Sequence, residues 1–423
     1  MEKQTEATEA LMVDADLDVL FEHLNHTKRT LQQEASNSIE CDIVADERAK
    51  LVAHYYKIQG EHLFRKLCQA DTKPSSLSGW ISAAKQLTPA LFFESTQTEQ
   101  ANSQQQMWAD KDAAMFVHHI LASSFKEVFT LSLLQPSLKA RELLDEFERN
   151  KGVQLSKIHV TVENEVATVS FLNSDCLNAE DDILVSDLAV AVDLVLLSNS
   201  VRVGVLRGGV VQHPKYSGKR IFSAGINLKY LATKNISYVD FLLQREFGYI
   251  HKLVRGLRIA NGAHFDVVEK PWLGVVESFA IGGGMQLLLA CDKVIAEQDS
   301  YVCLPAAKEG IVPGVANLRL ANLISPKLAQ QVILHGKKVT TNDVHAPLLF
   351  DEVHSTQNMD SATVEAAATL NSEAVLANRK MLRVAFEPLE QFMSYMSEFA
   401  LVQVERMYSQ DVLKKSSKFA NSN

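Results

Sequence analysis

The chain of 423 residues has few of the features that mark specialised protein classes. Its five cysteines, Cys41, Cys68, Cys176, Cys291 and Cys303, include no CxxC pair. That scatter disfavours a disulfide framework or a structural zinc site and favours a reducing compartment. No run approaches the roughly 18 apolar residues of a membrane span, and the acidic N-terminus lacks the apolar centre of a secretory signal. We therefore expect a cytoplasmic protein that makes no contact with a membrane.

Excess positive charge is also missing, since the net charge is −9, and this disfavours a nucleic-acid partner. Apolar residues make up 47% of the chain and charged residues 22%, which is typical of soluble globular proteins. This composition excludes wholesale disorder, a collagen-like chain and a coiled-coil rod. The length suits one large domain or two to three smaller ones.

The sequence pattern predicts three regions. Residues 1–150 are poor in glycine and proline, and apolar residues recur at helical spacing, as at Leu17, Leu20, Phe21 and Leu24. We expect a helical N-terminal region there, with a glutamine-rich loop at residues 95–106. Residues 359–423 again read as helices, joined near Asn371 and Pro388. These C-terminal helices either cap their own domain or serve as a subunit contact or lid.

The middle region, residues 151–358, alternates strand and helix patterns, which predicts an α/β fold with a mostly parallel sheet. Two alternating runs around Glu163 and Asn164 predict a β-hairpin at residues 158–172. Further strands are expected at 201–206, 272–276 and 294–296, and helices at 183–197, 239–255 and 284–291.

Three glycine-bearing segments in this region have the composition of ligand-binding turns. They are FSAGINL at residues 222–228, VESFAIGGGMQ at 276–286 and LPAAKEGIVPG at 304–314. Glycines that expose backbone N–H groups at the start of a helix can bind a phosphate or an oxyanion. Each segment taken alone could equally be an ordinary turn or surface connection.

Together, and in this order, the segments resemble the crotonase (enoyl-CoA hydratase/isomerase) superfamily over residues 155–350. The resemblance implies a ββα superhelix core and a coenzyme A thioester as substrate. It also implies that the backbone amides of Ile226 and Gly283 hold the thioester oxygen as it becomes an enolate. The basic turn HPKYSGKR at residues 213–220 would then lie near the coenzyme A. The residues expected to bind coenzyme A are Ser174, His213, Pro214, Lys215, Tyr216, Ala224, Gly225, Asn227, Leu228 and Lys229.

Two positions depart from the hydratase pattern. Hydratases of this superfamily carry one glutamate two residues after the glycine triplet and another just after the proline of the next loop. Here these positions are Gln286 and Ala306. Neither side chain can act as a general base, so addition of water by paired carboxylates is disfavoured.

A closer resemblance covers most of residues 155–415. The runs at 177–182, 201–210, 225–231, 239–257 and 304–314 are similar to the cofactor-free dioxygenases that act on (3,5-dihydroxyphenyl)acetyl-CoA. This implies that O2 is a co-substrate, that no metal or organic cofactor is used, and that the protein is a homotrimer or a dimer of trimers. It also implies that the ring hydroxyls are held by Glu180, Arg245 and the catalytic Gln286. Further candidates for the substrate pocket are Ile311, Val312 and Gln403.

Alternatives remain open at this stage. Glu180 could be a helix cap, Arg245 a surface ion-pair partner, and Gln286 a partner for backbone groups. Lys308 and Glu309 are either an acid/base pair or an ion pair that shapes the loop. The activity could also be hydrolysis or isomerisation of an acyl-CoA without O2, or binding without chemistry, or the same oxidation of a different ring. The residues do not identify the base that takes the α-proton.

Overall fold

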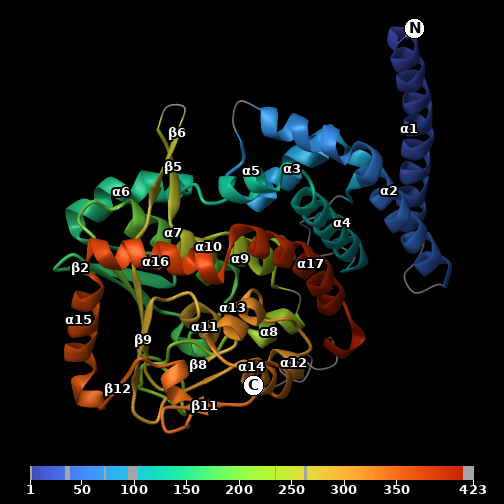
Figure 1. Ribbon diagram of the computed structural model, residues 1–423. Coiled ribbons are helices and arrows are strands. Elements are labelled where there is room, and N and C mark those ends of the chain that lie inside the picture. Colours follow the sequence, from blue (N-terminus) through green and yellow to red (C-terminus); the bar gives the residue numbers. More distant parts are fainter. Residues whose placement is uncertain are drawn as a thin grey trace. The chain divides into compact units, whose positions relative to one another are not determined.

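The computed structural model describes residues 2–33, 39–70, 73–93, 103–233, 235–261 and 264–412. The chain divides into two compact units (Figure 1). The first comprises residues 1–74 and 78–129, and the second comprises residues 75–77 and 130–423. None of the helices in the described ranges combines the length and the apolar character that crossing a bilayer requires.

The first unit is helical, as its apolar spacing predicted. Its core contains Phe64 and Phe116, whose ring centroids lie 5.9 Å apart, and a buried ion pair of 3.1 Å between Arg48 and Asp112. The predicted loop at 95–106 falls largely on residues 94–102, outside the described ranges, and its last four residues are helical instead. The helices are α1 (Glu2–Gln33), α2 (Ile39–Gln69), α3 (Leu77–Leu87), α4 (Ser103–Ala122) and α5 (Lys126–Ser132), the last of which leads into the second unit.

The second unit is built on a seven-stranded sheet of order β1-β2-β3-β4-β7-β9-β12. The first three strands pair antiparallel and the remaining pairs are parallel, so the expected mostly parallel α/β sheet is present. The strands are β1 (Gly152–Gln154), β2 (Ile158–Glu163), β3 (Val166–Phe171), β4 (Val203–Gly208), β7 (Trp272–Val276), β9 (Lys293–Glu297) and β12 (Glu352–His354).

Local sequence explains several of these elements. The predicted hairpin is confirmed as β2 and β3, and Asn164 and Glu165 both adopt positive φ, as a tight two-residue hairpin turn requires. β4 begins and ends two residues later than predicted. Helix α7 (Asp182–Leu197) begins where the side chain of Asp181 accepts a hydrogen bond of 3.0 Å from the Leu184 amide.

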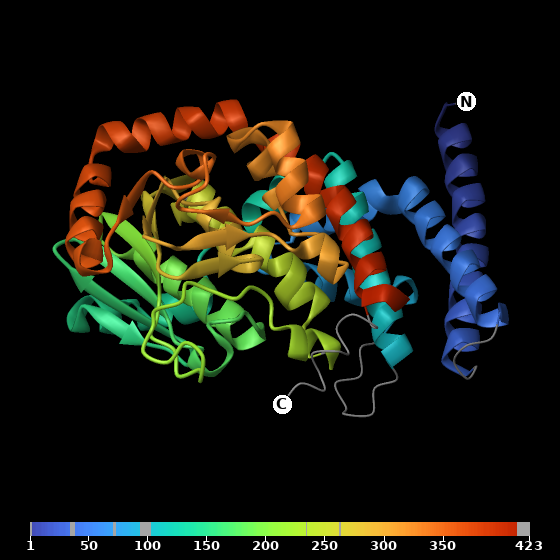
Figure 2. The same cartoon turned by 90° about the horizontal axis from the view of Figure 1, so that it is seen from below.

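The central strands of the main sheet pack against two helices, α15 (Met359–Leu370) and α11 (Gly283–Leu288). Alternate residues of β7 contact each helix. Val205, Leu273 and Ile295 form a buried cluster with α15, which lies alongside the strands in Figure 2. Gly274 is glycine because a Cβ there would lie 2.7 Å from the Leu288 side chain of α11. Close packing of α11 on the sheet fixes the glycine triplet at the helix start.

The predicted helix over residues 239–255 is broken. A π-helical turn (Tyr238–Leu243) leads into α9 (Gln244–Phe247), and α10 (Tyr249–Arg255) follows after Gly248. A Cβ on Gly248 would lie 2.5 Å from the carbonyl oxygen of Gln244, so the close chain approach at this break requires glycine. Single π-turns often occur at functional sites, and this break carries Arg245 and its neighbours.

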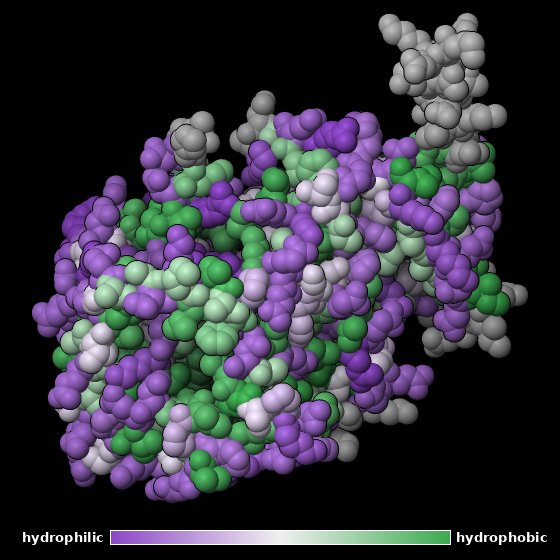
Figure 3. Space-filling view, in the orientation of Figure 1, coloured by the Kyte–Doolittle hydropathy of each residue, from purple (hydrophilic) through white to green (hydrophobic). Residues whose placement is uncertain are grey.

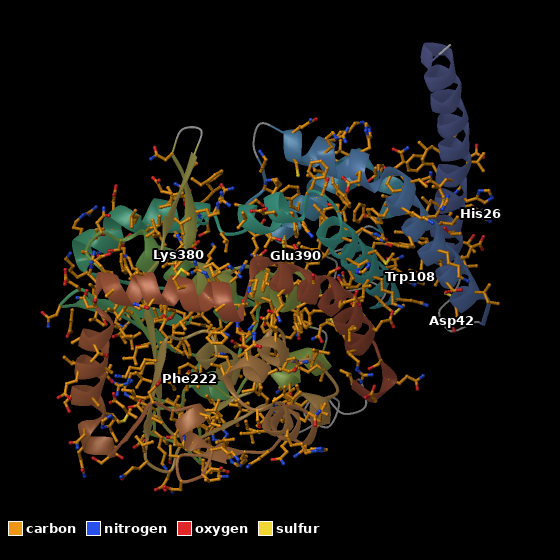
Figure 4. All side chains as sticks on the ribbon, viewed as in Figure 1. His26, Asp42, Trp108, Phe222, Lys380 and Glu390 are labelled. Atoms are coloured by element: carbon orange, nitrogen blue, oxygen red, sulfur yellow. The ribbon has the colours of Figure 1, made fainter. Side chains whose placement is uncertain are left out.

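The remaining elements complete the second unit. Two short sheets flank the main one, β11-β10-β8 and β5-β6. Phe222, labelled in Figure 4, is fully buried and packs edge-on against Phe171. The strands are β5 (Leu257–Asn261), β6 (His264–Val268), β8 (Phe279–Ile281), β10 (Tyr301–Cys303) and β11 (Val339–Thr340); the helices are α6 (Leu138–Asn150), α8 (Leu228–Ala232), α12 (Ala306–Glu309), α13 (Ala316–Leu323), α14 (Pro326–His335), α16 (Glu373–Phe386) and α17 (Leu389–Met407).

Candidate active site

The first two glycine turns lie against each other. Ser223 forms an isolated parallel bridge with Ala280, and the Ile281 amide donates to the Ser223 carbonyl oxygen at 2.9 Å. Gly225 has a φ of 85°, and a Cβ there would lie 2.8 Å from the Ile281 carbonyl oxygen and 3.2 Å from the Gly283 nitrogen. Only glycine allows this approach, which brings the two turns together.

The amides of Ile226 and Gly283 have no acceptor within the described part of the chain. The bridge between Glu180 and Ile226 uses the flanking groups: the Glu180 amide donates to the Gly225 carbonyl at 2.7 Å, and the Asn227 amide donates to the Glu180 carbonyl at 2.8 Å. The Ile226 N–H therefore points to the opposite side of its segment. Gly283 is the first residue of α11, where an N–H has no partner within the helix.

Beside these amides, Arg245 lies at the centre of a buried polar cluster. Its guanidinium donates to Glu180 Oε1 at 3.1 Å, to Glu246 Oε1 at 2.6 Å and to Gln286 Oε1 at 2.5 Å. It also donates to the Gly283 carbonyl oxygen at 2.9 Å. The N–H of the same residue points away from this carbonyl group. All four of these side chains are at most 9% exposed. Arg245 therefore ties the second glycine turn to the segments that carry Glu180 and Glu246.

The electrostatics of the cluster keep Arg245 charged. Burial alone would lower the pKa of the guanidinium, but Glu180, Tyr249 and Glu246 together outweigh burial and raise this pKa above its ordinary value. Tyr249, the first residue of α10, donates to Glu180 Oε1 at 3.3 Å. Burial raises the pKa of Tyr249 well above its ordinary value, so this phenol stays protonated and acts as a donor.

Two polar atoms of the cluster, Glu180 Oε2 and Gln286 Nε2, have no hydrogen-bond partner among the described residues. Every described donor to the Glu180 carboxylate reaches Oε1, and none reaches Oε2. Oε2 instead occupies the space that a Cβ on Gly283 would need, at 1.9 Å. Arginine can only donate, so the Gln286 oxygen must face Arg245. The Gln286 Nε2 has no acceptor among the described residues, which leaves it available as a donor.

One small cavity joins these groups. About 40 Å³ of it is open to water-sized molecules, enough for about three waters. It brings together all eight predicted residues of the catalytic and substrate-binding sets: Glu180, Ile226, Arg245, Gly283, Gln286, Ile311, Val312 and Gln403. The rest of its lining is mainly apolar, from Phe241, Leu242, Pro313 and Phe399. The arrangement is two backbone donors, a polar end and the Glu309 side chain in an otherwise apolar enclosure.

The loop after α12 closes this cavity against α17. Gln403 is 1% exposed, and its Oε1 accepts a hydrogen bond of 3.0 Å from the Val312 amide. Tyr395 donates to the Gly314 carbonyl oxygen at 2.5 Å. The C-terminal helix α17 therefore caps its own unit at this point, and Gln403 holds the loop in place.

Sequence reasoning missed two residues of the site, Glu246 and Tyr249, and considered Glu309 only as a partner of Lys308. Tyr249 lies four residues after Arg245, a spacing that places both on one helix face and could have been noticed. Glu246 follows Arg245 directly on α9, and adjacent residues of a helix point in different directions, so the helical pattern gave no sign that both line one cavity. Glu309 was read with Lys308, but no ion pair joins them in the described chain, and the Lys308 side chain lies over Gly336.

The residues expected to bind coenzyme A lie outside this cavity. Tyr216 packs on Phe279 with ring centroids 5.5 Å apart and belongs to one apolar cluster with Ala224. This contact brings the basic turn beside the first glycine turn. The Asn227 side chain caps α8 by accepting from the Tyr230 amide at 3.2 Å. Ser174 begins a short helical turn, and His213, Pro214, Lys215, Leu228 and Lys229 are partly or fully exposed.

Comparisons with known proteins agree with this architecture. The enoyl-CoA hydratase/isomerase family model matches residues 161–418. The chain is 42% identical over 395 residues to (3,5-dihydroxyphenyl)acetyl-CoA 1,2-dioxygenase of Amycolatopsis orientalis, covering 92% of this chain and 89% of that protein. It is 28% identical over 226 residues to carnitinyl-CoA dehydratase of Salmonella agona, covering 52% and 78% respectively.

Solved structures show the same fold. An enoyl-CoA hydratase from Mycobacterium avium subsp. paratuberculosis matches with a TM-score of 0.52 at 18% identity, covering 63% of this chain and 99% of that one. An enoyl-CoA hydratase/isomerase from Pseudoalteromonas atlantica matches with a TM-score of 0.50 at 18% identity, covering 62% and 96%. The protein, with its helices before and after an α/β core, belongs to the crotonase (enoyl-CoA hydratase/isomerase) superfamily.

Proposed function

We propose that the protein is a cofactor-independent dioxygenase that converts an arylacetyl-CoA, namely (3,5-dihydroxyphenyl)acetyl-CoA, and O2 into the arylglyoxylate and free coenzyme A. The observation that carries the proposal is the set of hydrogen-bonding groups in one mainly apolar cavity. Two backbone amides, of Ile226 and Gly283, can donate to a thioester oxygen. At the polar end, one carboxylate oxygen can accept and one side-chain amide can donate. The 42% identity to the Amycolatopsis dioxygenase supports the same conclusion.

The Ile226 and Gly283 amides would bind the thioester oxygen. Preorganised donors act most strongly on charge that develops during the reaction, and each contributes about 3–4 kcal/mol in an enclosed site. Loss of the α-proton then gives an enolate whose oxygen these amides stabilise. Because neither Gln286 nor Ala306 carries a carboxyl group, the two-glutamate addition of water is absent from this arrangement.

The polar end of the cavity would orient the ring. Glu180 Oε2 can accept a hydrogen bond from one ring hydroxyl, and Gln286 Nε2 can donate to another. Arg245 holds both side chains by the atoms that do not face the substrate. A ring without hydroxyls would leave these buried groups unsatisfied, which costs about 1–3 kcal/mol for each group.

The oxidation itself needs only the enolate and O2. The electron-rich α-carbon reduces O2 and forms a C–O bond, giving an α-peroxide. Its distal oxygen attacks the thioester carbonyl and expels the coenzyme A thiolate. Cleavage of the O–O bond with loss of the second α-hydrogen as a proton leaves the arylglyoxylate. The apolar lining, including Ile311 and Val312, suits an O2 molecule and excludes bulk water.

Coenzyme A and the subunit contacts belong to the same proposal. The exposed basic turn at His213–Arg220 suits the phosphates of coenzyme A, since it lies beside the first glycine turn. Helix α16 exposes Met381, Leu382, Val384 and Phe386, each at least 56% exposed, and Figure 3 shows apolar side chains among polar ones on the face it crosses. Exposed apolar side chains of this kind suit assembly into a homotrimer or a dimer of trimers. The regions 1–150, 151–358 and 359–423 would be the helical extension, the catalytic core and the oligomerisation or lid region.

The direct test follows dissolved oxygen in chelator-treated protein after addition of (3,5-dihydroxyphenyl)acetyl-CoA, with release of free thiol measured in parallel. Oxygen uptake matched by thiol release is the expected result. Thiol release without oxygen uptake would instead indicate a hydrolase of the same fold. Absence of both signals would point to a different acyl group or to binding without chemistry.

A further inference from the structure

The cavity contains a third carboxyl group, that of Glu309, which the steps above leave unused. Glu309 is the last residue of α12, and it lines the cavity together with Ala306 and the two oxyanion amides. Residues three apart lie on the same side of a helix turn, which explains why both face the same space. Ala306 is the position where hydratases carry a catalytic glutamate. In this chain the carboxyl group that reaches the cavity belongs instead to Glu309, one helical turn after Ala306.

The other two carboxylates of the cavity are already engaged. Glu180 and Glu246 both accept hydrogen bonds from Arg245, and Glu246 also accepts one of 3.2 Å from the Val315 amide. Protonation of either would weaken a charge-assisted hydrogen bond to a fully buried cation. Glu309 has no hydrogen bond or ion pair in the described chain, and Lys308 points away toward Gly336. It can take up a proton without breaking a contact.

The surroundings also suit Glu309 to proton transfer. Burial raises the pKa of its carboxyl group above the ordinary value, and no cation offsets this. A carboxylate with a raised pKa is a stronger base than an exposed one. Glu309 is only partly buried, so a proton that it accepts can pass to solvent.

We propose that Glu309 is the catalytic base that removes the α-proton of the bound thioester. This inference rests on the proposed function, because it assigns a role within the same site. The α C–H bond breaks, its electron pair enters the enolate, and the proton forms an O–H bond on the Glu309 carboxylate. The Ile226 and Gly283 amides carry the resulting charge on the thioester oxygen. Glu309 then releases the proton to solvent and is ready for the next turnover.

Deuterium exchange without oxygen tests this step separately from the oxidation. The full-length protein is incubated anaerobically with (3,5-dihydroxyphenyl)acetyl-CoA in D2O, and NMR follows loss of the α-hydrogen signal against an enzyme-free sample. The wild-type protein should catalyse the exchange. Glu309→Gln should slow it by at least about 100-fold, in the range expected for loss of a general base. Glu398→Gln, on an exposed position of α17, is the matched control and should exchange like wild type.

A second variant covers the possibility that Glu309→Gln alters folding. In Glu309→Ala the removed carboxyl leaves space, and added formate should restore part of the exchange in a concentration-dependent manner. Equal exchange in wild type and Glu309→Gln would overturn the assignment. So would absence of exchange in wild type, because a partly exposed base must trade its proton with solvent. Exchange that depends on Glu309 in a protein that consumes no oxygen would support Glu309 as the base and would contradict the proposed dioxygenase activity.

Discussion

Arg245 is the residue whose loss should damage the site most, and the structure sets the size of the effect. Arg245 is 3% exposed, and its guanidinium forms ion pairs with the carboxylates of Glu180 and Glu246, which are each 2% exposed. Arg245→Met retains the length and packing of the side chain but leaves Glu180 and Glu246 as uncompensated buried charges. Breaking a buried pair from one side typically costs about 3–5 kcal/mol. At about 2–4 °C per kcal/mol for a domain of this size class, the melting temperature should fall by about 6–20 °C.

The matched control is Arg202→Met, the same substitution in an ion pair on the surface. The Arg202 and Glu373 side chains are 45% and 77% exposed, and exposed pairs contribute about 0–1 kcal/mol. Differential scanning calorimetry of both variants at neutral pH makes the comparison. Adding Glu180→Gln to Arg245→Met should recover part of the lost stability, because one of the two unpaired charges is removed. A loss in Arg245→Met no larger than in Arg202→Met would refute the view of a charged, tightly coupled cluster.

Three further substitutions test other parts of the account. Gly225→Ala should lower kcat by about 100-fold or more in steady-state assays, because its Cβ would push the two glycine turns apart. Gln403→Leu leaves the Val312 amide without its acceptor and should raise KM in steady-state assays, with a stability loss of about 1–3 kcal/mol. Burial alone would raise the pKa of Glu387, but Arg319, Arg255 and Arg383 together outweigh burial and lower this pKa. The stabilisation that the Glu387 carboxylate provides is present above the ordinary carboxyl pKa and is lost as pH falls through the lowered pKa. The difference in melting temperature between wild type and Glu387→Gln should therefore narrow below about pH 4, and a constant difference would contradict the ion pair.

Local patterns predicted much of the core, because the elements concerned have a clear period. The alternation at residues 158–172 gave a hairpin that the backbone forms, and the buried run at 272–276 is β7 with the same bounds. The two glycine turns could be placed side by side only through the family resemblance. Nothing in either segment indicates its distance from the other, which depends on strand pairing between residues far apart in the chain.

The polar cluster shows what the sequence could not provide. The helical periodicity of residues 239–255 predicts one continuous helix, whereas the structure has a π-turn, the short helix α9 that carries Arg245 and Glu246, and a break at Gly248. Such a break is favoured by tertiary contacts that do not alter the local pattern. Glu309 was noticed only with Lys308, because adjacency in sequence suggests pairing, and the separate directions of the two side chains depend on how α12 packs.

Incorporation of ¹⁸O₂ tests the central claim most directly. The protein, treated with chelator, is given (3,5-dihydroxyphenyl)acetyl-CoA under ¹⁸O₂, and mass spectrometry measures the arylglyoxylate. The peroxide route places both atoms of one O2 molecule in the product, one in the keto group and one in the carboxylate, with the second carboxylate oxygen retained from the thioester. A product that carries both labels is the predicted result. A carboxylic acid released without any label would contradict the account and show that water, and not oxygen, attacks the thioester.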